Sequence, residues 1–283
     1  MKYCRYGIRG QEKPALVDDY GVIRDLSEHI QDLAGDMLAP NRLAELADIN
    51  FDKLPAIDPD VRLGPPVSHV GKFIGIGLNY ADHAAESGMD IPSEPVLFMK
   101  ATSSICGPYD SLVLPYGSKK TDWEVELGVI IGRHAKFVLE TDAMAYVAGY
   151  CIVHDVSERS FQLDHEGQWT KGKSADTFGP IGPWLVTKDE VPDPQSLNLW
   201  LSVNGKQMQN GSTRTMVFSV AFLVHYISQF MSLQPGDIIT TGTPPGVGMG
   251  KNPPQYLKVG DVVKLGVDGL GQQQQVVTAG SRK

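Results

Sequence analysis

The sequence predicts a mixed α/β fold that is rich in β-strands, with a small N-terminal α+β domain. From Lys72 onward, short apolar segments alternate with turns rich in Gly, Pro, Asn and Asp, the pattern of a sheet sandwich or barrel. Two helical segments stand out among these strands. The turn-rich sequence that begins at Leu63 separates a first unit, residues 1–65, from a larger one, residues 66–283.

The expected elements follow the chain in order. In the first unit, strands are expected around Tyr3–Ile8, Ala15–Val17 and Val22–Asp25, and helices near Ser27–Leu38 and Pro40–Ile49. Later strands are expected at Phe73–Ile76, Val96–Phe98, Val125–Ile131, Val147–Val153, Leu197–Val203, Asp237–Thr241 and Val262–Val267. One helix should begin at Asn79 or Tyr80, and another should cover about Thr215–Phe230 after a cap signal at Ser212 and Thr213.

Composition narrows the class of protein. The chain has 283 residues and a net charge of −8, and no Lys/Arg cluster with interleaved aromatics predicts nucleic-acid binding. The apolar stretch from Met216 to Met231 is interrupted by polar residues, so no membrane span is expected. Three widely spaced cysteines predict free thiols in a reducing compartment, and the N-terminus lacks the apolar segment of a signal peptide. A cytoplasmic protein is therefore expected.

The stretch Asp122-Trp-Glu-Val-Glu places three acids at alternate positions, with apolar residues between them. Alternate side chains of a β-strand point to the same face, so Asp122, Glu124 and Glu126 should line one side. Like charges this close repel unless a positive group lies among them, and carboxylate oxygens suit Mg²⁺. The alternative is a solvated edge strand. The apolar run up to Ile131 favours a strand that enters the core.

His83 and Glu86 are three residues apart, so on a helix they lie on one face and can touch. A carboxylate beside an imidazole raises its basicity and orients it, as a general base requires. A surface contact on an exposed helix is the alternative interpretation. The glycine-rich sequence that precedes Asn79 favours the rim of a site.

Asp155 follows an expected strand and could supply a third oxygen ligand beside Glu124 and Glu126. Arg159 and Gln162 come four and seven residues later, on one face of a helical turn. An arginine there could screen the acids or bind a substrate carboxylate, and a capped turn with a salt bridge is the alternative.

Other motifs give weaker or negative signals. Lys171 and Lys173 fit either charge stabilisation in a partly buried loop or simple surface exposure. The glycines at Gly75 and from Gly242 to Gly250 do not have the spacing of a dinucleotide-binding or P-loop motif. Serine-hydrolase and zinc-protease motifs are absent from the sequence.

Six segments in this order resemble the fumarylacetoacetate hydrolase family, over roughly residues 70–270. They are Gly77-Leu-Asn-Tyr-Ala-Asp-His83-Ala-Ala-Glu86, Pro95-Val-Leu-Phe-Met-Lys100, Asp122-Trp-Glu-Val-Glu-Leu-Gly-Val-Ile-Ile-Gly132, His154-Asp-Val-Ser-Glu-Arg159-Ser-Phe-Gln162, Gln168-Trp-Thr-Lys-Gly-Lys173 and Pro235-Gly-Asp-Ile-Ile-Thr-Thr-Gly-Thr243. The chain looks most like the bacterial branch that contains 2,4-diketo-3-deoxy-sugar-acid and acylpyruvate hydrolases.

The resemblance implies a β-sandwich roll, usually dimeric, and a set of site residues. It implies that Mg²⁺ or Mn²⁺ is bound by Glu124, Glu126 and Asp155. It implies that His83 and Glu86 activate water on a lid, and that Lys173 and Gln162 contact substrate oxygens. Lys100, Arg159 and Thr243 would lie near the same pocket.

The hypothesis from sequence is hydrolysis of the C3–C4 bond of a 2,4-dioxo acid to pyruvate and a carboxylic acid. His83, oriented by Glu86, would deprotonate the water that attacks the 4-carbonyl. Decarboxylation and keto–enol isomerisation at the same metal site stay open as alternatives. A catalytically silent metabolite-binding or structural protein is the alternative of another class. Specificity for the rest of the substrate is expected from the lid, residues 84–95.

Overall fold

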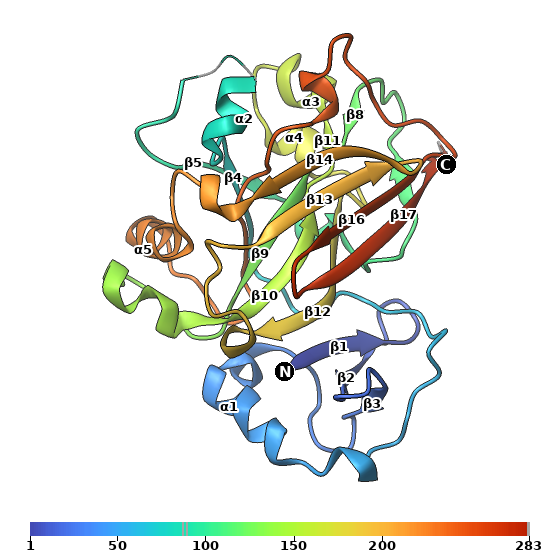
Figure 1. Cartoon of the computed structure of the whole chain (residues 1–283), viewed down its shortest axis with the longest axis vertical. Helices are drawn as coiled ribbons and strands as arrows, with labels where there is room; N and C mark the ends of the chain where they lie inside the picture. Colours follow the sequence, from blue (N-terminus) through green and yellow to red (C-terminus); the bar gives the residue numbers. More distant parts are fainter. Residues whose placement is uncertain (87, 89, 282–283) are drawn as a thin grey trace.

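The computed structural model describes residues 1–86, 88 and 90–281. Its largest sheet has ten strands, and nine of them form a continuous row (Figure 1). In spatial order the row is β3 (Ile23–Asp25), β2 (Lys13–Val17), β1 (Lys2–Tyr6), β12 (Gly179–Thr187), β10 (Val147–His154), β9 (Val125–Ile131), β15 (Ile238–Thr240), β4 (Phe73–Gly77) and β5 (Val96–Lys100). The tenth strand, β6 (Ile105–Cys106), pairs with β12.

Two further sheets complete the strand-rich fold. A five-stranded sheet runs in the order β14 (Lys206–Ser212), β13 (Asn198–Val203), β16 (Val262–Val267), β17 (Gly271–Ala279) and β7 (Leu112–Leu114). A short ladder pairs β8 (Thr121–Asp122) with β11 (Ser157–Glu158). Since the two large sheets pack on a shared core, the predicted mixed, strand-rich sandwich is confirmed.

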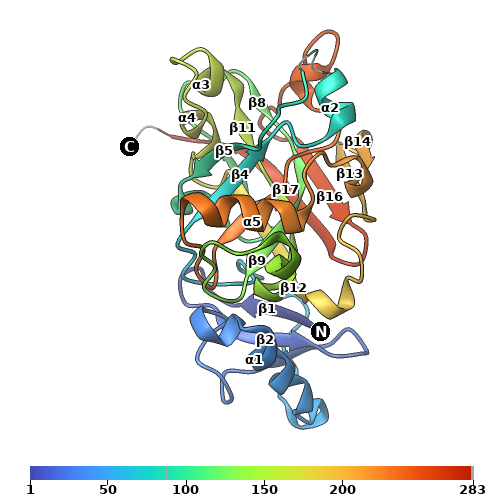
Figure 2. The same ribbon diagram turned by 90° about the vertical axis from the view of Figure 1, so that its left-hand side faces the viewer.

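Helices are short and lie around the sheets. The α-helices are α1 (Pro40–Glu45), α2 (Ala81–Glu86), α3 (Arg159–Leu163), α4 (Thr170–Lys173) and α5 (Val220–Phe230). Short 3₁₀ segments lie at Gly35–Leu38, Leu46–Asp48, Phe51–Lys53, Thr102–Ser104, Glu140–Tyr146, Lys188–Glu190, Thr213–Thr215 and Gly248–Gly250. Figures 1 and 2 show α2, α3 and α4 at the end of the molecule farthest from β1–β3. No described helix is long and apolar enough to cross a membrane.

The central strands are buried on both faces. Every residue of β9 and β10 is buried, as expected for strands that read as continuous apolar runs. On one face, Val125, Leu127 and Val129 join a core that includes the five-stranded sheet and α5. On the other, Ile130 packs with residues of the N-terminal region such as Tyr3. This burial fixes the ends of β9 and β10, which carry the acidic residues.

Two helix predictions are wrong in their bounds. Residues 27–34 form turns and bends, because the carboxylates of Asp25 and Asp32 accept hydrogen bonds from nearby backbone N–H groups and compete with a helix. The later helix begins at Val220, where the Ser219 hydroxyl accepts a hydrogen bond from the N–H of Phe222. The strands predicted at Val125–Ile131 and Val262–Val267 agree with β9 and β16. The division of the chain near residue 65 stays a prediction.

Candidate metal centre and active site

Three carboxylates converge where β9 and β10 meet. Glu124 directly precedes β9 and Glu126 is its second residue, while Asp155 directly follows β10, the antiparallel neighbour of β9. The N–H of Asp155 donates to the carbonyl of Glu124 at 3.0 Å, which fixes their relative position. All three side chains are buried, and one oxygen from each lies within 4.8 Å of the others. The strand register therefore brings Glu124 and Glu126, two of the three alternating acids, together with Asp155.

The cluster fits a hard divalent cation. Mg²⁺ and Mn²⁺ prefer carboxylate oxygens, and three such groups converge here away from solvent. Glu126 is held in place because its carboxylate accepts hydrogen bonds from the Thr240 hydroxyl at 2.5 Å and from the Gly242 N–H at 2.8 Å. Since each carboxylate has about four lone-pair sites, these contacts leave acceptors for a metal.

Two lysines neutralise part of this charge. Nζ of Lys173 lies 2.5 Å from a Glu124 oxygen and 2.7 Å from an Asp155 oxygen. Nζ of Lys100 lies 2.6 Å from the other Asp155 oxygen and also donates to the carbonyls of Val156 and Lys173. An ammonium group has three donors, so Lys100 is fully occupied within the chain, whereas Lys173 keeps one donor for a ligand.

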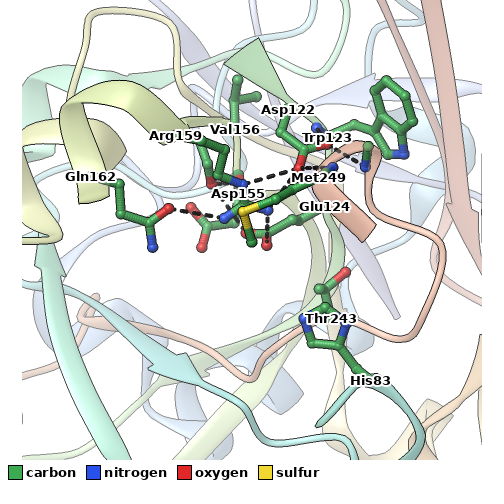
Figure 3. A network of polar contacts seen from close by, with 12 residues as sticks. His83, Asp122, Trp123, Glu124, Asp155, Val156, Arg159, Gln162, Thr243 and Met249 are labelled. Atoms are coloured by element: carbon green, nitrogen blue, oxygen red, sulfur yellow. Dashed lines mark hydrogen bonds and ion pairs between the residues drawn. The ribbon is translucent and has the colours of Figure 1, made fainter. Parts of the chain in front are cut away.

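Arg159 also contacts the acidic residues (Figure 3). Its guanidinium donates to Asp122 at 3.0 Å, to Glu124 at 2.7 Å and to the side-chain oxygen of Gln162 at 3.0 Å. These bonds follow from α3, which places Arg159 and Gln162 on one face at a spacing of three residues. Arg159 therefore orients the acids, and Gln162 keeps its amide nitrogen as a donor that can reach a ligand.

The buried charges shift each other's pKa values in opposite directions. Burial alone would raise the pKa of Glu124, but the positive charges of Arg159 and Lys173 outweigh it and hold that pKa well below its usual range. Burial, followed by the charges of Asp155 and Glu124, raises the pKa of Glu126 well above its usual value. The two neighbouring carboxyls therefore have pKa values that are shifted in opposite directions.

His83 and Glu86 lie on α2, opposite the carboxylates. His83 is buried, and its Nδ1 lies 3.5 Å from a Glu86 oxygen, too far for a hydrogen bond of normal geometry. The Glu86 carboxylate instead accepts the Gly246 N–H at 2.9 Å. In Figure 3, His83 lies apart from the group formed by Asp155, Arg159 and Gln162.

The hydroxyl of Thr243 forms two hydrogen bonds within the chain. Its hydroxyl donates to the carbonyl of Val125 at 2.9 Å and accepts from the Gln209 amide at 2.8 Å. Both contacts fix the start of β9. Because these bonds already engage the hydroxyl, the geometry favours a structural role for Thr243 over the substrate contact implied by the resemblance.

Asp122 accepts backbone hydrogen bonds that the alternating pattern of acids did not predict. The prediction of three acids with an apolar opposite face holds in part, since Trp123, Val125 and Leu127 do share one core cluster. Asp122, however, lies in β8 and accepts backbone hydrogen bonds from Gly248 and Met249. A long-range contact with backbone N–H groups leaves no pattern in the sequence. The only signal was the acid's place in the alternating stretch.

Comparison with known proteins decides the family. The family model described as Fumarylacetoacetate (FAA) hydrolase C-terminal matches residues 72–278. The chain belongs to this family. It is 63% identical over 276 residues to a protein of Burkholderia orbicola that carries only a provisional hydrolase name, covering 97% of this chain and 98% of that protein.

Solved structures of the family share the whole fold. A fumarylacetoacetate hydrolase from Exiguobacterium antarcticum is 35% identical with a TM-score of 0.88, covering 99% of this chain and 100% of that one. A probable 2-hydroxyhepta-2,4-diene-1,7-dioate isomerase from Mycobacterium abscessus is 32% identical with a TM-score of 0.82, covering 100% of both chains. A maleylpyruvate hydrolase from Sphingobium sp. SYK-6, in complex with manganese(II) and pyruvate, is 28% identical with a TM-score of 0.83, covering 99% and 100%.

Proposed function

We propose that this protein is a metal-dependent hydrolase that cleaves the C3–C4 bond of a 2,4-dioxo acid, such as an acylpyruvate or a 2,4-diketo-3-deoxy sugar acid. The products are pyruvate and a second carboxylic acid. The observation that carries the proposal is the convergence of three buried carboxylates, with Lys173 beside them and the His83–Glu86 pair opposite. The related maleylpyruvate hydrolase, solved with manganese(II) and pyruvate, supports an acylpyruvate substrate.

Each residue has a distinct task in this proposal. Glu124, Glu126 and Asp155 would hold Mg²⁺ or Mn²⁺, which when bound would supply Lewis acidity for the pyruvoyl end of the substrate. His83, with Glu86 beside it, removes a proton from the water that attacks the 4-carbonyl carbon. Lys173 and Gln162 donate hydrogen bonds where negative charge develops.

The proposed reaction is a hydrolysis that consumes one water molecule. The attacking water gives its oxygen to the acyl carbon, and the C3–C4 bond breaks with its electron pair going to C3. The proton that His83 removed from the water is then returned to C3, which completes pyruvate. Lys100 acts on this step only through the carboxylate of Asp155, since its three donors are engaged within the chain. Arg159 uses three of its five N–H groups on Asp122, Glu124 and Gln162 and keeps an N–H of Nη1 for a substrate oxygen.

Isomerisation is a second candidate function. The Mycobacterium abscessus relative carries an isomerase name, and its 32% identity to this chain exceeds that of the Sphingobium hydrolase. Both reactions use an enolate-stabilising site, but isomerisation needs no attack by water. Product analysis separates them, because hydrolysis releases pyruvate whereas isomerisation leaves the carbon skeleton intact.

A substrate panel tests the proposal. Acylpyruvates and diketo-deoxy sugar acids are supplied with Mg²⁺ or Mn²⁺, and pyruvate release is compared for the unmodified enzyme, His83→Ala and Glu124→Ala. The proposal expects release that depends on both residues. Pyruvate release that survives both substitutions, or conversion of substrate without any pyruvate, would refute it.

We also propose that the protein acts in the cytoplasm as a homodimer. Its three cysteines, Cys4, Cys106 and Cys151, are free and buried, which suits a reducing compartment. The dimer is expected from the family resemblance. Light scattering of the purified protein tests it, and a monomeric mass would contradict it.

A further inference from the structure

Asp122 connects three separate segments of the chain. Its carboxylate is fully buried and accepts the N–H groups of Gly248 at 2.6 Å and Met249 at 3.0 Å. The same side chain accepts Nε of Arg159 at 3.0 Å and the N–H of the adjacent Trp123 at 2.8 Å. A buried carboxylate with four donors is held in one orientation, so the segments that it joins are held as well.

Asp122 is connected to the metal centre through hydrogen bonds of Arg159. Arg159, which it orients, donates to Glu124 at 2.7 Å and to Gln162 at 3.0 Å (Figure 3). The guanidinium is planar and its donors are fixed relative to one another. Any shift of Asp122 therefore changes the direction from which Arg159 holds Glu124.

Asp122 is also connected to Glu86 of the His83–Glu86 pair, through the loop of residues 246–250. Gly246 donates its N–H to Glu86 at 2.9 Å, only two residues before Gly248 contacts Asp122. A Cβ on Gly248 would lie 2.0 Å from the Gln255 carbonyl oxygen, and one on Gly246 would lie 2.1 Å from that of Met208. Gly246 also has a φ of +107°, which favours glycine. The loop is thus closely packed and cannot absorb a displacement easily.

From these contacts we propose that Asp122 is a positioning residue that sets the place of the 246–250 loop, and through it of Glu86, relative to the metal-binding carboxylates. It touches neither the substrate nor His83. Its role rests on the proposed function in one respect: the two groups that it aligns are the water-activating pair and the metal centre. The alignment itself is a property of the chain and is measurable without turnover.

The first experiment follows hydrogen exchange of the backbone N–H groups of Gly246–Gly250 with and without saturating Mn²⁺. In the unmodified protein, Mn²⁺ slows their exchange by about 2- to 30-fold, the range for coupling through directly connected residues. In Asp122→Asn this slowing disappears, because the amide has one acceptor oxygen where the carboxylate has two. Its NH2 group would face either the N–H groups of Gly248 and Trp123 or those of Met249 and Arg159. Asp237→Asn is the matched control. Asp237 is also buried and accepts backbone N–H groups, from Lys72 and Gln234, but within the described residues it forms no hydrogen bond or ion pair with Arg159 or the loop. The control keeps the slowing. Slowing that persists in Asp122→Asn overturns the proposal.

A second variant keeps the test decisive if Asp122→Asn fails to fold. Arg159→Lys retains a positive charge beside Glu124 but cannot also bridge to Asp122 and Gln162 with a planar fork. The proposal expects loss of the Mn²⁺-induced slowing here too. Normal slowing in this variant overturns it.

A double-mutant cycle then tests the catalytic consequence. If Asp122 acts through Glu86, the rate losses of Asp122→Asn and Glu86→Gln are not multiplicative, and the double variant is about as slow as the slower single variant. Asp237→Asn with Glu86→Gln gives multiplied losses. Fully multiplied losses for the Asp122 pair refute the proposal. Absence of turnover in the unmodified enzyme would instead refute the proposed function, and the exchange experiment would still decide the role of Asp122.

Discussion

The carboxylate cluster and the α2 pair are built in contrasting ways. Glu124, Glu126 and Asp155 are buried at the ends of core strands, and each has hydrogen-bonded or charged partners. His83 and Glu86 lie on a six-residue helix, 3.5 Å apart, and Nδ1 of His83 has no hydrogen-bond partner among the described residues. The first group is preorganised to hold a charged ligand. The second becomes complete only when a further molecule supplies the missing partner.

From this contrast we expect that substitutions in one region change metal affinity, whereas substitutions in the other change only the catalytic rate. Changes in the carboxylate cluster should alter metal affinity first and rate as a consequence. Changes on α2 should alter rate and leave metal affinity as it is. Residues that have no connection to either region should affect neither metal affinity nor rate, even when they carry buried charge.

The largest effect on metal affinity is expected for Glu126→Gln. The amide keeps an oxygen that can accept from Thr240 and Gly242 but loses the negative charge that a cation requires. Mn²⁺ affinity should fall by more than about 100-fold, the upper range for loss of a residue that only supports a metal ligand. Isothermal titration of the metal-free protein with Mn²⁺ measures this. Near-normal affinity would show that Glu126 is no ligand and would remove the basis of the contrast.

His83→Gln should lower the turnover number by about 10²- to 10⁴-fold, the usual contribution of a general base. Mn²⁺ affinity should not change, because His83 contacts none of the three carboxylates in the described structure. Parallel rate and titration measurements test both statements. A large loss of metal affinity in this variant would mean that the two regions are not separable.

Lys173→Met tests a residue that contacts the carboxylate cluster and is also proposed to contact the substrate. Removal of the ammonium leaves the buried charges of Glu124 and Asp155 partly unpaired, so the metal-free protein should lose about 3–5 kcal/mol of stability. Bound Mn²⁺ should restore most of that loss, while the rate stays about 10²- to 10³-fold low for want of a charge-stabilising donor. Denaturant unfolding with and without Mn²⁺ measures the first effect. A variant that Mn²⁺ does not stabilise more than the unmodified protein would contradict this account.

The smallest effect on activity is expected for Asp110→Asn, which lies outside both regions. Asp110 forms two bonds of 2.7 Å with Arg62, which lies in the N-terminal 65 residues. Burial would raise the pKa of Asp110, but the hydrogen bonds from Arg62 and from the backbone of Gly107 lower it overall. A lowered folded-state pKa contributes stability above the ordinary carboxyl pKa of about 3.9 and loses it as pH falls through the folded value.

At pH 7 the Asp110→Asn variant should therefore be less stable by about 1.5–3 kcal/mol, the range for hydrogen bonds to charged groups. The difference should shrink towards pH 3, and Mn²⁺ affinity and rate should be unchanged. Unfolding by denaturant at the two pH values tests this. An equal loss at both would show that the charge of Asp110 is not what stabilises the contact.

Sequence reasoning succeeded where local pattern decides the structure. The apolar run of β9 and its alternating acids place Glu124 and Glu126 correctly, because a strand has a fixed period of two. The helical spacing of Arg159 and Gln162 likewise predicts the contact between their side chains.

It failed where partners are distant in the chain. The contact of Lys100 with Asp155 spans 55 residues, and that of Glu86 with Gly246 spans 160. Strand β17 was missed because its glutamines show no apolar periodicity, although Gln273 and Gln275 are buried and donate to backbone carbonyls. Hydrogen bonds of these kinds depend on tertiary structure and leave no regular spacing of residues.

The most direct test of the whole account is anomalous X-ray scattering from crystals of the unmodified protein grown with Mn²⁺. We expect one anomalous peak per chain, bonded to oxygens of Glu124, Glu126 and Asp155 and lying across from His83. A peak at any other position, or none at saturating Mn²⁺ with Lys173 still bridging Glu124 and Asp155, would contradict the proposed metal centre.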